Sequence, residues 1–167
     1  MVFAFSKRGR YEGNMSYYNI VLLEPEIPQN TGNIGRVCVG FNCHLHLIKP
    51  FGFELSDKNL KRAGLDYWQD LKWTTYENWG EFYPNIESHR EQVYFMTTKT
   101  EKSLYSKKFK QGDWFIFGKE TKGIPEQVLK EHESQNLTIP FPGQVRSFNL
   151  ANSVSIVASE AFRQLEL

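Results

Sequence analysis

Residues Asn30 to Arg36 (NTGNIGR) combine amides, glycines and an arginine at a spacing that could hold a charged ligand. They follow an apolar segment and open a predicted helix, whose first backbone N–H groups favour a phosphate or a carboxylate. Asn33 and Arg36 are three residues apart, so a helix directs both side chains to one face. The pattern is neither the GxGxxG of dinucleotide-binding folds nor a P-loop. A glycine-rich turn followed by a surface arginine stays open as the alternative.

A second loop, Gly118 to Pro125 (GKETKGIP), follows the apolar segment DWFIF. Its glycines and its helix-starting proline predict a tight, exposed turn. Glu120 lies between the glycines, where its carboxylate could accept hydrogen bonds from a ligand or from a neighbouring backbone. Taken alone, this loop is better explained as an ordinary strand-to-helix connection with charged surface residues.

The third loop runs from Ile139 through prolines and a glycine into the last amphipathic pattern of the chain. Ser147, Asn149 and Asn152 stand where this last helix should begin. They could cap the helix, or they could bind a substrate hydroxyl or the edge of a nucleoside. A connection of this length so close to a helix start is typical of a binding loop.

Apolar segments alternate with helical patterns along the chain, and this alternation defines the elements that must position the loops. We expect strands over residues 17–23, 45–49, 71–75, 93–98, 113–118 and 137–140. We expect helices over residues 30–41, 56–63, 78–83, 125–132 and 150–165. Most strands are continuously apolar, which favours an α/β fold with a mostly parallel sheet and helices on both faces. Ligands of such sheets bind at the carboxyl ends of the strands.

Length and charge limit the possible classes of protein. The chain has 167 residues, a net charge of +1, 40% hydrophobic residues and 23% charged residues. These values indicate one folded domain, which we assign to residues 15–167, preceded by a flexible extension over residues 1–14. No apolar run approaches the roughly 20 residues of a membrane span, so no membrane partner is expected.

The two cysteines could form a disulfide, and two of the histidines could bind a metal, but neither is expected. Cys38 and Cys43 fall in one predicted helix and its exit, so they are predicted to be buried free thiols of a cytoplasmic protein. His44 and His46 share one face of a predicted strand without a third ligand nearby, which favours a structural role.

Taken together, the loops NxGNxxR, GxExxG and SxNxxxA, in this order, resemble the three motifs of the SPOUT superfamily of methyltransferases. The segments KRAGLDYW, FMTTK and RSFNLANSVSIVASEAFRQL resemble its small single-domain branch, which methylates the ribose 2′-hydroxyl of the tRNA wobble nucleotide, cytidine or uridine 34. The resemblance runs from Tyr17 to the C-terminus. It implies a deep trefoil knot in the C-terminal part, which ordinary connection rules would not predict. It also implies a homodimer that acts on the anticodon region of tRNA.

The resemblance further implies S-adenosyl-L-methionine (AdoMet) as methyl donor, S-adenosyl-L-homocysteine as product, and no metal. The residues it implies for cofactor binding are Met96, Thr97, Gly118, Glu120, Gly123, Ile139, Ser147 and Leu150. The residues it implies for catalysis are Arg36, Asn33, Ser147 and Asn149. Sites of such dimers lie at the subunit interface, so Asn30, Asn33 and Arg36 are expected to come from the partner chain.

Arg36 is the implied activating residue for a ribose hydroxyl, which is a weak nucleophile at neutral pH. Because arginine rarely gives up a proton, we expect it to orient and polarise the hydroxyl, together with a substrate phosphate. Ser159 stands where the branch often has a tyrosine, which leaves open another tRNA or rRNA nucleotide as the target. A knotted dimer that binds RNA without catalysis is the third possibility.

Overall fold

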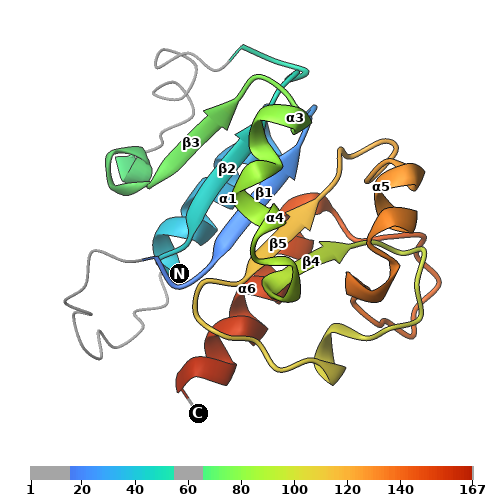
Figure 1. Cartoon of the computed structure of the whole chain (residues 1–167). Helices are drawn as coiled ribbons and strands as arrows, with labels where there is room; N and C mark the ends of the chain where they lie inside the picture. Colours follow the sequence, from blue (N-terminus) through green and yellow to red (C-terminus); the bar gives the residue numbers. More distant parts are fainter. Residues whose placement is uncertain (1–15, 55–65, 167) are drawn as a thin grey trace.

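A computed structural model describes residues 16–54 and 66–166. The predicted extension over residues 1–14 and the predicted helix over residues 56–63 lie outside this part of the chain. The described residues form one sheet with helices packed on both of its faces (Figure 1). None of the helices in this part is long and apolar enough to cross a membrane.

Six strands form the sheet, in the order β3-β2-β1-β5-β4-β6, and every neighbouring pair is parallel. The strands are β1 Asn19–Leu23, β2 His44–Ile48, β3 Trp73–Tyr76, β4 Val93–Met96, β5 Trp114–Phe117 and β6 Asn136–Leu137. Continuous apolar runs suit strands that are covered on both faces. The predicted parallel α/β sheet is therefore confirmed.

Helices cover both faces of this sheet. They are α1 Pro28–Gly40, α3 Trp79–Phe82, α4 Pro84–Glu87, α5 Glu126–Glu131 and α6 Leu150–Glu166. Successive side chains of β1 point to opposite faces. Ile20 and Leu22 therefore pack with α1 and α6, whereas Val21 and Leu23 pack with α3, α4 and α5. Figure 1 shows α3 and α4 in front of the sheet and α6 behind it.

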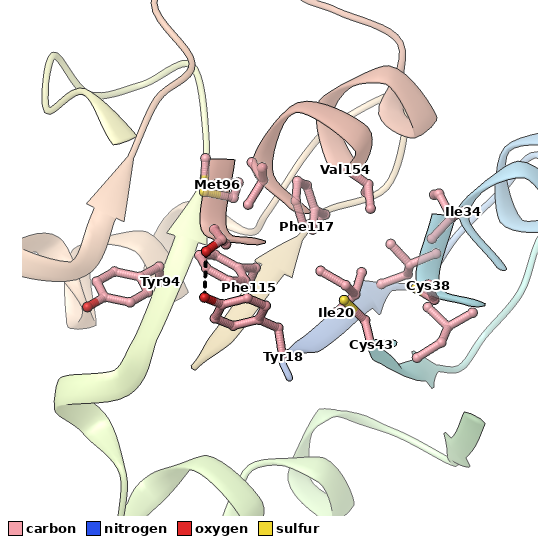
Figure 2. Packing of buried hydrophobic residues seen from close by; sticks show 14 of the residues in the cluster. Tyr18, Ile20, Ile34, Cys38, Cys43, Tyr94, Met96, Phe115, Phe117 and Val154 are labelled. Atoms are coloured by element: carbon pink, nitrogen blue, oxygen red, sulfur yellow. Dashed lines mark hydrogen bonds between the residues drawn. The ribbon is translucent and has the colours of Figure 1, made fainter. Parts of the chain in front are cut away.

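The last helix is tied to the first strand region through the larger of the two cores (Figure 2). Val154, Val157 and Ala161 are fully buried along the inner stripe of α6, as the helical spacing predicts. The hydroxyl of Tyr18, itself buried, donates to the backbone oxygen of Ala161 at 2.6 Å. This bond joins segments 143 residues apart, and it fixes α6 relative to the sheet.

The start of α1 differs from the prediction. The helix begins at Pro28, and Ile27 precedes it as N-cap without a side-chain cap. The predicted start of this helix at residue 30 is therefore wrong by two residues. Proline suits the first helical turn because its fixed φ matches the helix and its missing N–H needs no acceptor there. Asn30 and Thr31 instead donate their N–H groups to the backbone oxygen of Ile27.

The cysteines and histidines behave as predicted. Cys38 and Cys43 are buried and free. The rings of His44 and His46 stack, with centroids 4.2 Å apart. Burial lowers the pKa of His46 to about 3, and its ring nitrogens bond to Tyr76 and Asn19, so it is a neutral structural residue.

Candidate functional site

A cavity of about 610 Å³ opens at the carboxyl ends of β4, β5 and β6. Its walls come from the residues that follow β5, β4 and β6, from the loop before α6, and from the first turn of α1. The loops converge because parallel strands end at one edge of a sheet.

The turn after β5 is held tight by its glycines. A side chain at Gly118 would place its Cβ 2.0 Å from the carbonyl carbon of Gly123, so only glycine fits there. Gly123 has a φ of +68°, a conformation that glycine adopts without strain. The turn thus folds back on itself and presents Glu120 toward α1.

Glu120 holds the two residues that lead into α1 from this turn. Its carboxylate accepts the backbone N–H of Glu26 at 2.8 Å and that of Ile27 at 3.1 Å. In return the Glu26 carboxylate accepts from the N–H and the hydroxyl of Thr121 at 2.8–3.0 Å. These bonds lower the pKa of Glu26, so this carboxylate stays charged near neutral pH. Of the two partners predicted for the Glu120 carboxylate, the structure shows the neighbouring backbone.

Asn30 links Glu120 to the third loop, and we call the chain Glu120–Asn30–Asn149 the amide relay. The side-chain NH₂ of Asn30 donates to Glu120 at 3.1 Å, and its oxygen accepts from the NH₂ of Asn149 at 2.9 Å. The oxygen of Asn149 then accepts the N–H groups of Ala151 and Asn152, which caps α6. Because a carboxylate can only accept, it fixes the orientation of both amides.

All of the residues predicted to bind the cofactor line this cavity: Met96, Thr97, Gly118, Glu120, Gly123, Ile139, Ser147 and Leu150. They come from three segments at the ends of β4, β5 and β6, the last of which runs into α6. The structure therefore brings this predicted set together around one cavity, and Ser147 and Asn149, from the predicted catalytic set, line it as well.

Asn33 and Arg36 do not line the cavity of their own chain. Both are exposed on α1, and the Arg36 guanidinium carbon lies 4.7 Å from the ring centroid of Tyr67. Asn30, which was expected to serve the partner's site together with them, is 6% exposed and lines the cavity of its own chain. That expectation is wrong for Asn30, because the first turn of α1 faces inward toward Glu120.

Several lining residues were missed by the sequence analysis. Phe117 ends β5 and Ile124 follows the turn, and both contribute apolar wall. Phe141 pairs with Phe148, with ring centroids 4.7 Å apart, and both lie at the cavity. The position of Phe117, at the end of an apolar strand and directly before Gly118, was a usable signal. Nothing in the spacing of Phe141 and Phe148 indicates that their rings meet.

The charge around the cavity is mainly positive. Lys99, Lys122 and Arg146 lie exposed at its wall. Lys119 is paired with Glu24 at 2.5 Å, and this hydrogen bond raises the pKa of the lysine. Cationic side chains around a site favour a polyanionic partner such as a nucleic-acid backbone. Within residues 16–54 and 66–166, no group of three His, Cys, Asp or Glu side chains is arranged to hold a metal ion.

Comparison with protein families gives one match over most of the chain. The model of the SpoU rRNA Methylase family matches residues 17–159. A tRNA (cytidine(34)-2'-O)-methyltransferase of Saccharophagus degradans is 46% identical over 151 residues, which cover 89% of this chain and 96% of that protein. A protein of the same name from Burkholderia cenocepacia is 39% identical over 148 residues, covering 88% and 95%.

Solved structures share the fold. A structure described as giving insights into the 2-OH methylation of C/U34 on tRNA has a TM-score of 0.80 and 42% identity, covering 89% of this chain and 95% of that one. The SpoU methyltransferase AviRb from Streptomyces viridochromogenes, in complex with the cofactor AdoMet, has a TM-score of 0.77 at 19% identity. It covers 92% of this chain and 59% of that one, and at this identity it shows the fold alone.

Proposed function

The chain belongs to the SpoU rRNA methylase family, and on this premise we propose that it methylates the ribose 2′-hydroxyl of nucleotide 34 of tRNA, with AdoMet as methyl donor. Its fold is the knotted SPOUT fold of its structural neighbours, as the sequence resemblance implied. The observation that carries the proposal is the convergence of all three motif loops on one cavity, held together by the amide relay. The activity is that of the similar curated proteins.

The cavity has the size and the chemistry that AdoMet requires. Its volume of about 610 Å³ lies within the usual range of small-molecule sites. Met96, Ile124 and Leu150 offer apolar wall to a flat heteroaromatic base, while Thr97 and Ser147 offer hydrogen-bonding groups to hydroxyl and charged groups. When bound, AdoMet supplies a methyl group on a positively charged sulfur, which needs no metal to activate it.

Arg36 is assigned the orienting and electrostatic role toward the ribose hydroxyl. The ribose oxygen would form a bond to the methyl carbon while the bond from that carbon to sulfur breaks, which would leave neutral S-adenosyl-L-homocysteine, and the hydroxyl proton would pass to water or to a substrate phosphate. A guanidinium stabilises the negative charge that develops on that oxygen, and it can bind a neighbouring phosphate through its several N–H donors. Asn33 lies on the same face of α1 and assists in binding. Ser147 and Asn149 organise the cavity side of the site.

We further assign a homodimer, in which Arg36 and Asn33 complete the site of a second copy. The support is their position, since both are exposed on α1 and neither lines the cavity of its own chain. Ile27, 42% exposed just before the same helix, adds apolar surface that a second copy could cover.

We also propose a cytoplasmic location for the protein, since that is where tRNA is modified.

Mixed dimers test this arrangement. Chains carrying Arg36→Ala and chains carrying Asn149→Ala, each inactive alone, should regain activity when they are mixed, because one of the two sites then receives an intact Arg36 and an intact Asn149. The unmixed variants at the same total concentration are the control. Absence of any recovery, with mixed dimers demonstrated by mass, would show that Arg36 acts within its own chain.

The proposed chemistry is tested by Arg36→Ala itself. We expect turnover with unmodified tRNA to fall by about 10²-fold or more, the scale for losing one charge-stabilising donor. AdoMet affinity should stay unchanged because the role assigned to Arg36 is toward the ribose hydroxyl and a substrate phosphate, not toward the cofactor. Arg90→Ala, at an exposed arginine that pairs with Glu87 away from the cavity, is the matched control. Undiminished turnover of the Arg36 variant would refute the assigned role.

A further inference from the structure

Tyr67 contacts both the side chain of the proposed activating residue, Arg36, and the backbone of α1, the helix that carries Arg36. It belongs to the 3₁₀ turn η1, Asp66–Asp70, which precedes β3 in the chain and packs against α1. Its ring centroid lies 4.7 Å from the guanidinium carbon of Arg36. Its hydroxyl donates to the backbone oxygen of Gly32 at 2.5 Å. In α-helical geometry that oxygen also accepts the N–H of Arg36, four residues on.

Gly35 allows this turn to approach so closely. A Cβ at Gly35 would lie 2.9 Å from the ring carbon Cζ3 of Trp68 and 3.3 Å from Leu71. The ring of Trp68 therefore rests directly on the backbone of α1, one residue after Tyr67. The glycine next to Arg36 thus permits the contact that brings Tyr67 within hydrogen-bond reach of Gly32.

We propose that Tyr67 is a positioning residue for the methyl-transfer reaction, which holds the guanidinium of Arg36 in the orientation that meets the ribose hydroxyl. The inference rests on the proposed catalytic role of Arg36. An exposed arginine has several rotatable bonds, and its planar guanidinium stacks on an aromatic face. The ring of Tyr67 is held in place by the hydrogen bond of its hydroxyl to Gly32 and by the packing of the neighbouring Trp68 on Gly35, so the stacked orientation is fixed relative to α1. A misplaced group costs rate because the reacting atoms must meet in a narrow geometry.

Two substitutions at Tyr67 separate the ring from the hydroxyl. Tyr67→Leu removes the aromatic face, and we expect kcat to fall by about three- to tenfold, on the scale of an exposed cation–π contact together with lost orientation. Tyr67→Phe keeps the face but loses the anchor, and we expect a smaller loss, of about twofold. In both variants the KM for AdoMet should match the wild type, and the melting temperature should fall by no more than about 4 °C, the scale for one lost hydrogen bond. Tyr105→Leu, at a tyrosine 53% exposed and outside the cavity, is the matched control.

A third variant, Arg36→Lys, shows whether the effect acts through Arg36. Lysine keeps the charge but has no planar group to stack on the ring. Adding Tyr67→Leu to the Arg36→Lys variant should therefore change the single-turnover rate constant by less than about twofold. Independent, multiplicative losses in the double variant would overturn the proposal.

The outcomes separate this inference from the function on which it rests. If Arg36→Ala retains turnover, the proposed role of Arg36 fails and the positioning role fails with it. If Arg36→Ala is inactive while Tyr67→Leu keeps wild-type kcat, only the positioning role is overturned. A Tyr67→Leu variant that loses kcat, AdoMet binding and melting temperature together would assign Tyr67 a purely structural role and would also overturn the proposal.

Discussion

Replacing Asn30 with aspartate removes the donor of one hydrogen bond of the amide relay and leaves the size of the side chain almost unchanged. The NH₂ group that donates to Glu120 at 3.1 Å becomes a carboxylate oxygen, which can only accept. Two negative charges at that separation repel by about 5 kcal/mol at an effective dielectric constant of 20. Asn30 is 6% exposed but Glu120 is half-buried, so we take about 3 kcal/mol as the working penalty.

This penalty depends on pH, and its sign is fixed. Repulsion raises the pKa of the introduced aspartate in the folded protein above its value of about 3.9 in the unfolded chain. The folded state then holds a proton that the unfolded state has lost, so stability falls as pH rises through that window. A penalty of about 3 kcal/mol raises that pKa by roughly two, so the loss is complete above about pH 6. At pH 5 the variant should have lost about half of the roughly 3 kcal/mol of folding free energy that it loses above pH 6.

Thermal unfolding of the variant and the wild type, each at pH 5 and pH 8, measures the effect. At this chain length about 1 kcal/mol lowers the melting temperature by roughly 2–4 °C, so we expect Asn30→Asp to melt about 6–12 °C below wild type at pH 8 and about half as far below it at pH 5. Asn30→Ala loses the bonds without adding a charge, so its deficit should be the same at both values. An equal deficit of Asn30→Asp at both pH values would refute the relay as described.

Three further substitutions test the packing around the site. Gly118→Ala places a Cβ 2.0 Å from the carbonyl carbon of Gly123, so the turn must move. AdoMet affinity, measured by calorimetry, should then fall at least about tenfold. An unchanged affinity would contradict the described turn. Asp113→Asn should raise the melting temperature above pH 6 and have little effect below pH 4. Burial raises the pKa of this carboxyl to about 6, so its ionisation destabilises the fold as pH rises; a gain that is the same at all pH values would be evidence against this. Tyr18→Phe removes the buried hydrogen bond to Ala161. Chemical denaturation should show a free energy of unfolding lower by about 1–2 kcal/mol, with turnover unchanged. A variant as stable as the wild type would show that this bond does not stabilise the fold.

The parallel sheet and the last helix could be predicted because their signals are local. The apolar runs that became β1, β2 and β5 are buried on both faces, and the stripe of α6 has an unbroken helical period. The start of α1 could not be predicted in the same way. The two residues before it, Glu26 and Ile27, donate their N–H groups to Glu120, more than 90 residues away, so the contact that fixes this start is not visible near Pro28 in the sequence.

The candidate site was predictable in its composition and only partly in its geometry. Parallel strands end at one edge, so loops recognised by their motifs had to meet there, and the predicted cofactor residues do line one cavity. The inward position of Asn30 and the stacking of Arg36 on Tyr67 depend on contacts between distant segments. Those contacts follow from packing, which motif spacing does not encode.

The proposed function names the ribose 2′-hydroxyl of nucleotide 34 as the acceptor of the methyl group. It is tested most directly with two otherwise identical tRNA transcripts, one carrying a 2′-deoxynucleotide at position 34 and the other carrying one at position 33. Transfer of labelled methyl from AdoMet should be abolished for the first and retained for the second, with the label recovered as a 2′-O-methylated nucleoside at position 34. Equal labelling of both transcripts would contradict the account, because the methyl group would then go to another nucleotide.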